Sequence, residues 1–441
     1  MEDGGLGTES SEVRVEYNSS QSRTAPEFRV YKRRWFILLV LCVLNCSNSV
    51  LWLTFAPVAD QTAEHLHVTL DQVNWLSVVY MVVAIPLSFI TTWMLDTLGL
   101  RPTMILGSWL NMAGSVVRVV GVLSYLPENT MFPVVMAGQT LCALAQPLVI
   151  FSPTKLAALW FPEHQRATAN MIASMSTVGI QKSVPPTPPS ASADTSSSEP
   201  FLQGIKLLLT NKAYMILLVC FGSGIGIFTC FATLLEQILC VKGYSNDFAG
   251  LCGALFIVSG VIGAAFLGLF VDKTKLFTES IKISMCLTSL SCTAFAVVSQ
   301  LEEQKVIIGA VCALFGLFGF ASYPVAMELS VECSYPVGEA TSAGLVFISG
   351  QIQSIVYTML LPALTTKLAH SPLSVCAAGD DANLSWMVPV LVMAGLCCLA
   401  SCTFVVIFHT QYRRLNAEAD AVKTHSAQTE TEGMTKRSTD A

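Results

Sequence analysis

The chain has 441 residues, of which 53% are hydrophobic and only 12% are charged, with a net charge of -6. A soluble globular domain carries about 25% charged residues, so this chain lacks the polar side chains that would cover a soluble core. It has no basic patch interleaved with aromatic residues, which argues against nucleic acid as a partner. The mean hydropathy of +0.60 instead indicates a membrane protein.

Ten apolar segments are long enough to cross a bilayer as helices, because a hydrocarbon core of about 30 Å requires roughly 20 residues. They cover residues 35–58, 74–95, 102–125, 131–153, 213–238, 249–271, 280–300, 305–328, 339–363 and 386–408. Polar residues, Pro or Gly bound each segment. The sequence therefore predicts an all-α polytopic membrane protein with about ten transmembrane helices.

Lys and Arg set the expected orientation, because they concentrate on the cytoplasmic side of membrane proteins. If the chain starts in the cytoplasm, the outer loops receive only Lys242, Lys305 and Lys367. The inner segments receive Arg29, Lys32, Arg33, Arg34, Arg101, Lys155, Arg166, Lys182, Lys206, Lys212, Lys273, Lys275, Lys282, Arg413 and Arg414. Both termini are therefore predicted to be cytoplasmic, in a plasma or organelle membrane.

Composition divides the chain into five parts. Residues 1–30 and 411–441 are predicted to be disordered cytoplasmic tails. Residues 31–181 form an N-terminal helical half with four spans and a short stub, and residues 213–410 form a C-terminal half with six spans. Between them, residues 182–212 contain a Pro/Ser-rich stretch that is typical of a linker.

Cysteine and histidine give little sign of special chemistry. Most of the 15 cysteines fall inside apolar segments, where they are expected to pack as small apolar side chains. Cys240 and Cys376 are the two whose positions allow an outward-facing disulfide. The six histidines form no ligand cluster, and no nucleophile, base and acid occur in a recognisable set. The sequence thus predicts no metal site, no cofactor and no enzyme activity.

A short inner loop between the second and third spans contains Asp96, Gly99 and Arg101. The glycine suits a sharp backbone turn, and the charged residues are expected to tie helix ends together by pairing and capping. An ordinary inner loop is the alternative interpretation.

A second loop, with Asp272, Lys273 and Lys275, occupies the matching place in the C-terminal half. Two matching loops suggest two related halves, which is the pattern of transporters built from repeats.

The D-x-x-G-x-R loop resembles the signature of the major facilitator superfamily, which usually has twelve helices in two six-helix halves. More narrowly, the chain resembles solute carrier family 49, the feline leukaemia virus subgroup C receptor-related group, over residues 31–175 and 200–410. The shared stretches are Asn74–Met81, Trp93–Arg101, Thr233–Gln237, Asp272–Lys275 and Glu332–Ser342. The last of these places Glu332 and Glu339 among the expected motif residues.

The chain departs from that pattern in its N-terminal half, where four spans and a stub replace six helices. Most of helix five and all of helix six are predicted to be absent, as in an alternatively spliced form. The missing helices favour a second hypothesis, in which the chain does not transport.

The resemblance implies a site for choline or ethanolamine, with haem also proposed for the family. A quaternary ammonium is held by cation–π contact in an aromatic cage. Trp52 aligns with the caging tryptophan of the family and Gln351 with a cavity glutamine. Thr229, beside Phe228, stands where the choline carriers have a tyrosine, and Ser176–Thr177 offer no counterpart of the glutamine in helix five. Alternatively, Trp52 is a packing or interfacial aromatic.

Two further polar features lie inside predicted spans. Arg118 would cost about 2.5–3.5 kcal/mol at a helix centre, so we expect a substrate anion, Gln139 or Gln146 as its partner, or an outward snorkelling side chain. The run from Asn45 to Ser49 interrupts the apolar surface of the first span. It either lines a polar cavity or forms hydrogen bonds with neighbouring helices.

The sequence predicts a transporter that moves a small organic solute through the bilayer by alternating access. The second hypothesis is a non-transporting truncated form that binds or modulates a full-length relative. The expected partners are a small-molecule solute and the lipid bilayer.

Overall fold

A computed structural model describes residues 33–55, 58–123, 127–161, 165–166, 168–169, 200–301, 303–367, 384–417 and 419–420. In chain order the elements are α1 (Arg33–Leu53), α2 (Ala59–Leu66), α3 (Leu70–Thr97), α4 (Leu100–Val122), α5 (Glu128–Ile150), α6 (Ser152–Trp160), α9 (Phe201–Thr210), α10 (Lys212–Cys240), α11 (Asn246–Thr274), α12 (Phe277–Val298), α13 (Lys305–Ser334), α14 (Glu339–Ala363), β1 (Thr366–Lys367), β2 (Leu384–Ser385) and α15 (Met387–Ile407). The two short strands pair antiparallel.

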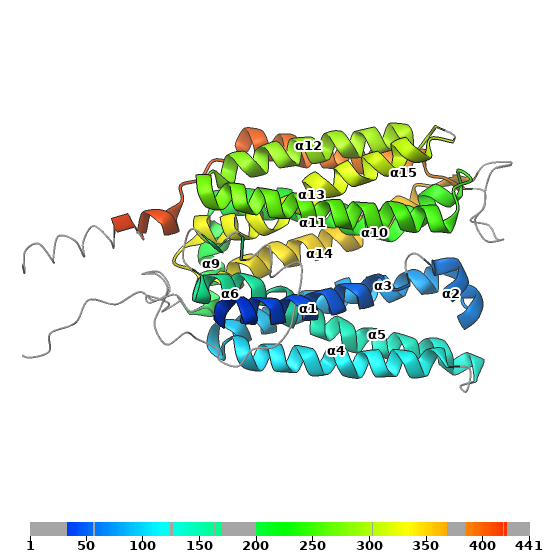
Figure 1. Cartoon of the computed structure of the whole chain (residues 1–441), viewed down its shortest axis with the longest axis horizontal. Helices are drawn as coiled ribbons and strands as arrows, with labels where there is room; N and C mark the ends of the chain where they lie inside the picture. The colour runs from blue at the N-terminus through cyan, green and yellow to red at the C-terminus, as the bar shows by residue number, and fades with distance from the viewer. Residues whose placement is uncertain are drawn as a thin grey trace, which may run out of the picture.

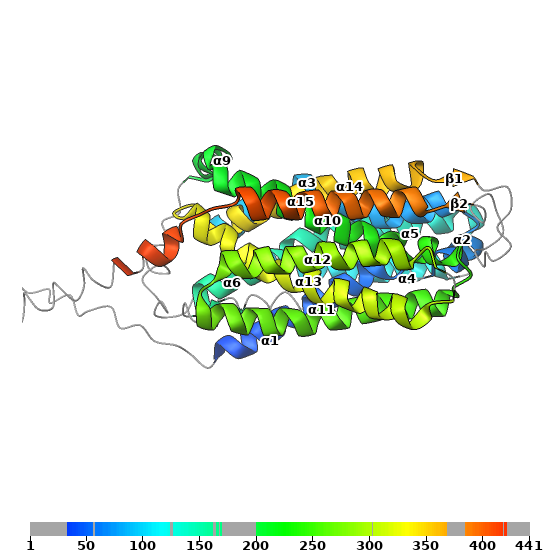
Figure 2. The same cartoon turned by 90° about the horizontal axis from the view of Figure 1, so that it is seen from above.

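Ten helices among the described residues are long and apolar enough to cross a membrane, four before residue 200 and six after it. This confirms the predicted all-α bundle and its number of spans. The fourth span combines α5 and the shorter α6, which follows it directly. The long helices run side by side in two layers, with α1, α3, α4 and α5 in one and α10 to α15 in the other (Figures 1 and 2). We call these layers the N-terminal and C-terminal halves.

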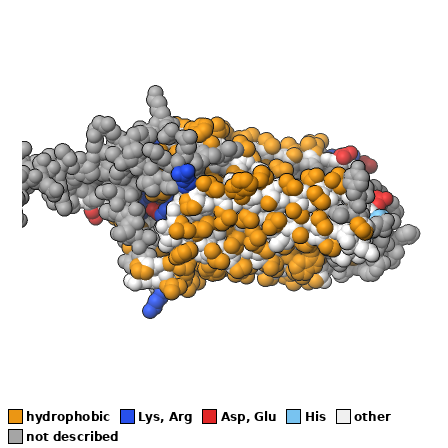
Figure 3. Space-filling model, turned by 90° about the horizontal axis from the view of Figure 1, so that it is seen from below, with side chains coloured by type: hydrophobic (Ala, Val, Ile, Leu, Met, Phe, Trp, Pro, Cys, Tyr) orange, Lys and Arg blue, Asp and Glu red, His pale blue; other side chains and the backbone are white. Residues whose placement is uncertain are grey.

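The surface of the bundle is that of a membrane protein. Large apolar side chains such as Phe36, Phe266 and Val406 are exposed along its length. Figure 3 shows an apolar belt around the middle of one face, with charged side chains near the two ends. Such a belt suits lipid tails, whereas a soluble monomer rarely exposes a contiguous apolar patch of this kind. Below, the inner end of the bundle is the end predicted to be cytoplasmic.

Three segments predicted as loops or tails contain helix. α2 lies in the predicted outer loop 59–74, α9 lies in the predicted linker 182–212, and residues 413–417 are helical within the predicted tail 411–441. All three are shorter than the roughly 20 residues used to recognise a span, so hydropathy could not reveal them. Other parts of the linker and both tails lie outside the described residues.

One cysteine behaves differently from the majority. Cys240 at the end of α10 is disulfide-bonded, and its partner lies outside the described residues, as does Cys376. The other described cysteines form no disulfide, and most of them are buried. The prediction that cysteine serves mainly as a packing residue is confirmed for these.

Close contact between α11 and α13 depends on glycine. A Cβ atom built at Gly263 would collide with the backbone carbonyl of Leu317, whereas one built at Gly250, on the same helix, meets no atom within 4 Å. Because backbone cannot rotate out of the way, a side chain at Gly263 must push the two helices apart.

Gly263→Ala is therefore expected to destabilise the solubilised protein by about 1–3 kcal/mol, and Gly250→Ala is expected to change its stability little. Thermal melting followed by size-exclusion chromatography measures both variants. Equal melting temperatures would contradict the close packing of α11 on α13.

Candidate functional site

A central cavity lies between the two halves, midway along the long helices. Its walls come from α1, α3 and α5 of the N-terminal half and from α10, α12, α13, α14 and α15 of the C-terminal half. The cavity has a volume of about 180 Å³, whereas a single water requires only ~10–15 Å³ on the same scale. The cavity is thus large enough for a small organic solute, at the depth where transporters bind their substrates.

Aromatic and uncharged polar side chains line this cavity. The aromatic residues are Trp52, Tyr80, Phe221, Phe228, Phe315, Phe320, Tyr323 and Phe347. The polar residues are Asn45, Ser49, Gln146, Thr229, Thr288, Ser322, Gln351 and Ser401. None of the described residues that line it is Asp, Glu, Lys, Arg or His. A ligand would therefore meet π faces, amides and hydroxyl groups but no counter-ion.

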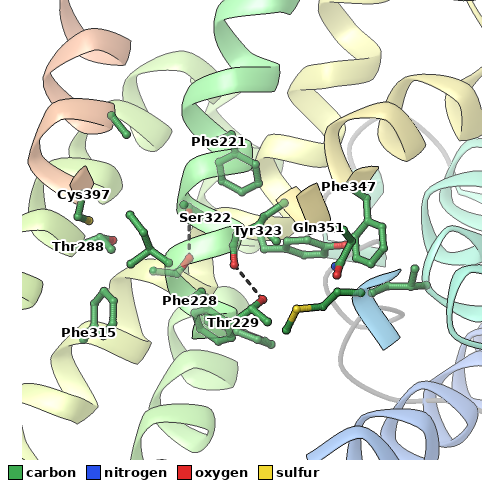
Figure 4. A pocket seen from close by; sticks show the side chains of 18 of the residues that line it. Phe221, Phe228, Thr229, Thr288, Phe315, Ser322, Tyr323, Phe347, Gln351 and Cys397 are labelled. Atoms are coloured by element: carbon green, nitrogen blue, oxygen red, sulfur yellow. Dashed lines mark hydrogen bonds between the residues drawn. The ribbon is translucent and has the colours of Figure 1, made fainter. Parts of the chain in front are cut away.

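Four of the five residues predicted to bind substrate line the cavity. Gln351 is buried and comes from α14, beside Phe347 (Figure 4). The indole Nε1 of Trp52 has no hydrogen-bond acceptor among the described residues. Phe228 stacks on Phe256 with ring centroids 4.5 Å apart. The placement agrees with the sequence prediction, and the roles of these residues stay predictions.

Thr229 contributes less polarity than its type suggests. Its hydroxyl donates a hydrogen bond to the carbonyl of Ile225 in the same helix, at 2.9 Å (Figure 4). This bond uses the hydroxyl proton within α10, so toward a ligand the Thr229 oxygen can act only as an acceptor.

The polar run of α1 serves both purposes that the sequence left open. Asn45 and Ser49 line the cavity. Asn48 instead donates from Nδ2 to Oδ1 of Asn111 on α4 at 3.2 Å and contacts the carbonyl of Cys142 on α5 at 3.3 Å. One face of this run thus supplies cavity amides and hydroxyls, and the other ties α1 to its neighbours.

Arg118, the fifth residue predicted to bind substrate, does not line the cavity. Its Nη1 donates to the carbonyl of Leu51 at 2.9 Å, and its guanidinium lies 4.7 Å from the ring centroid of Phe55. The side chain is buried, with 5% exposed, so it does not snorkel. The expected partners were wrong because a backbone carbonyl on α1 and an aromatic face, which hydropathy cannot reveal, bind the cation instead.

A cluster of charged residues joins the halves at the inner end. Lys155 Nζ lies 2.9 Å from Oδ1 of Asp96 on α3 and 3.0 Å from Oε2 of Glu339 on α14. Thr341 Oγ1 donates to Oδ2 of the same Asp96 at 2.8 Å. Asp96 and Lys155 belong to the N-terminal half, whereas Glu339 and Thr341 belong to the C-terminal half. These contacts close the inner end beside α14.

The chain segment after α15 adds to this cluster. Arg414 lies 3.6 Å from Glu328 and 3.9 Å from Glu339, and its side chain is 2% exposed. The backbone N–H of Leu415 donates to Oε2 of Glu332 at 3.1 Å. The buried Glu332 thus binds the C-terminal segment, a contact that its predicted place in an inner motif did not indicate.

The first predicted loop motif is only partly as expected. Gly99 has φ 87° and precedes α4, as a sharp turn requires. Arg101 is exposed, and the described partners of Asp96 are Lys155 and Thr341 rather than this arginine. The expectation that Asp96 ties helix ends together holds, but the cation comes from α6.

The second motif contacts the other half through its aspartate. The buried Asp272 accepts a hydrogen bond from the backbone N–H of Thr168 at 2.7 Å. Lys273 is exposed, and Lys275 ends α11 with φ 58°. At the opposite end of the bundle, Gln237 Nε2 donates to Asn74 Oδ1 at 3.1 Å.

Sequence reasoning missed Lys155, Arg414 and the cavity aromatics Phe221 and Tyr323 as site residues. Lysine and arginine near inner helix ends are expected from topology alone, so nothing marked these two. The aromatic residues sit in helices that are apolar all round, where the sequence does not show which face points inward.

Comparisons with known proteins agree with this architecture. Residues 37–180 match the family model of the Major Facilitator Superfamily. Among solved structures, the proton:xylose symporter XylE of that superfamily superposes with a TM-score of 0.62 at 12% identity, over 87% of this chain and 98% of the symporter. The two-layered bundle around a central cavity is thus the fold of the major facilitator superfamily of membrane transporters.

Sequence relatives narrow the assignment. Solute carrier family 49 member A3 of Danio rerio is 60% identical over an alignment that covers 91% of this chain and 92% of the relative. The choline/ethanolamine transporter FLVCR1 of Felis catus is 28% identical over an alignment that covers 86% of this chain and 75% of that protein. The chain belongs to solute carrier family 49, as its motifs predicted.

Proposed function

We propose that this chain carries a small organic cation of the choline or ethanolamine type across a membrane by alternating access. The observation that supports this most directly is the cavity between the halves, which is rich in aromatic residues and has no charged residue among its described lining. A quaternary ammonium cannot donate hydrogen bonds, so cation–π contact with aromatic rings binds it better than hydrogen-bonding groups do. The choline/ethanolamine transporters among the relatives support the same substrate class.

Each part of such a ligand has a complementary group in the cavity. Trp52 from α1 and Tyr323 from α13 offer aromatic faces from the two halves. The amides of Asn45, Gln146 and Gln351 offer both donors and acceptors for a hydroxyl or a primary ammonium. An anionic solute would find no cation among these residues, so we expect anions to be poor substrates.

Uptake of radiolabelled choline and ethanolamine, at matched abundance of protein in the membrane, tests the proposal. Trp52→Ala is expected to reduce uptake roughly 30-fold at low substrate concentration, which corresponds to the ~2 kcal/mol of a desolvated cation–π contact. Trp93→Ala is the matched control, because Trp93 is 45% exposed and does not line the cavity; its uptake should match that of the unchanged chain.

Two outcomes would contradict the proposal. Equal loss of uptake in both tryptophan variants would mean that Trp52 acts through folding. Uptake no greater than that of cells without the protein would exclude choline and ethanolamine as substrates. If uptake then appeared only after two helices were restored following Ser176, the non-transporting hypothesis would be favoured.

A further inference from the structure

Among the described helices, most of the packing between the two halves lies on one side of the bundle. α3 and α6 pack on α14, and among the described helices of the C-terminal half only α14 makes more than marginal contact with helices α1 to α6. α1 and α11 lie on the opposite side of the bundle, in different layers (Figures 1 and 2). On that side the backbone N–H of Thr168 donates to Asp272 at the inner end.

On α1, the wall of the cavity continues directly into the lipid-facing surface. Asn45 and Trp52 line the cavity, whereas Cys46 and Val50 are exposed. At about 3.6 residues per turn, Ser49 lies between these two groups on the helix surface. Ser49 is both a cavity-lining residue and an exposed one, so it marks the border of an opening.

The other border of the opening lies where α13 meets α11. Phe320 lines the cavity, and its side chain packs at Gly260 of α11. Beyond this contact, α11 exposes Val258, Ile262 and Phe266. An alkyl chain that left the cavity here would therefore pass from the aromatic lining to the apolar outer surface of α11, where these three exposed side chains carry no charge.

We infer that the cavity opens to the bilayer between α1 and α11 and binds single-chain amphiphiles with a quaternary ammonium head group. The head enters the aromatic cavity, and the alkyl chain stays among the lipid tails, where it needs neither desolvation nor room inside the protein. A phosphate or carboxylate next to the head would have no cation in the described cavity lining, so amphiphiles that carry one are rejected. This inference rests on the cation site of the proposed function and extends its substrate class.

Photolabelling of the purified full chain tests the inference without requiring transport. The probe is hexadecyltrimethylammonium with a diazirine in its alkyl chain, in nanodiscs of phosphatidylglycerol and phosphatidylethanolamine, and labelled peptides are mapped by mass spectrometry. We expect peptides of α1 (residues 39–50) and α11 (residues 258–266) to be labelled several-fold more than residues 116–122 of α4, which also expose apolar side chains such as Val116 and Val119. The same chain with a phosphocholine head should label all three helices alike.

Variants at the border sharpen the test. Ser49→Phe fills the opening and should remove the excess label on α1 and α11, whereas Val116→Phe, on the lipid-facing side of α4, should retain it. Ser49→Leu provides a smaller block if the phenylalanine variant melts at a lower temperature.

Equal labelling of the three helices, excess labelling that survives both blocking variants, or cross-linked pairs of this chain in place of probe adducts would each overturn the inference. Uptake of water-soluble choline distinguishes the two proposals. Choline uptake with uniform labelling would sustain transport and reject the opening, and selective labelling without choline uptake would do the reverse.

Discussion

Replacement of Lys155 by alanine is expected to destabilise the folded chain by roughly 3–5 kcal/mol. The ammonium group lies 2.9 Å from Asp96 and 3.0 Å from Glu339, and the three side chains are only 9%, 9% and 18% exposed. Its removal leaves two neighbouring carboxylates with little solvent and without the cation that compensates them both. The melting temperature of the solubilised protein, read by size-exclusion chromatography after heating, measures the loss.

Two comparisons show whether the charge is responsible. Lys206→Ala changes an exposed lysine on α9 and should leave the melting temperature unchanged. The triple variant Lys155→Met, Asp96→Asn, Glu339→Gln removes all three charges together and should recover much of the stability that Lys155→Ala loses. If Lys155→Ala melts like Lys206→Ala, the cluster does not hold the inner end together.

Arg414→Ala is expected to lower the stability by a similar amount, roughly 3–5 kcal/mol. Its guanidinium lies 3.6 Å from the buried Glu328 and 3.9 Å from Glu339, and the next residue donates its backbone N–H to Glu332. Loss of the arginine leaves carboxylates of α13 and α14 without this cation and frees the segment after α15. The same melting assay, together with limited proteolysis after residue 410, detects both effects.

The neighbouring Arg413 provides the control, because it has the same charge and an exposed side chain. Arg413→Ala should change neither the melting temperature nor the rate of proteolysis. Arg414→Lys should be more stable than Arg414→Ala, because lysine keeps the positive charge but lacks the planar guanidinium group. Similar melting and proteolysis for the two alanine variants would show that position 414 has no special role.

Hydropathy was sufficient to predict the ten spans, because each is long and almost free of charge. It could not predict the ion cluster, because Lys155 and Glu339 lie 184 residues apart in the chain and Asp96 and Thr341 lie 245 residues apart. Which lysine meets which carboxylate depends on how the halves pack, and a linear pattern carries no record of this. The short helix α9 was not predicted because its 10 residues are too few to be recognised as a span.

The cavity could be predicted only through family resemblance. Trp52 and Gln351 were found because their surrounding motifs resemble known carriers, and both line the cavity. Tyr323 was not found, because α13 is apolar on all sides and its sequence does not reveal which face is turned inward. Arg118 was misplaced because a charge inside a span suggests a ligand site, whereas here it binds backbone and an aromatic ring.

Because α14 carries most of the packing between the described helices of the two halves, different motions of the halves should differ in free-energy cost. A rotation about an axis along α14 changes the width between α1 and α11 and keeps Lys155 paired with Asp96 and Glu339, and the bond it must break among the described residues is the one from Thr168 to Asp272. A tilt that parts the inner ends must break Lys155 from Glu339 and Thr341 from Asp96. We therefore expect the gap between α1 and α11 to widen toward the lipid often, and the cavity to open to the inner solution rarely. Breaking the ion cluster would then be the rate-limiting step of a transport cycle.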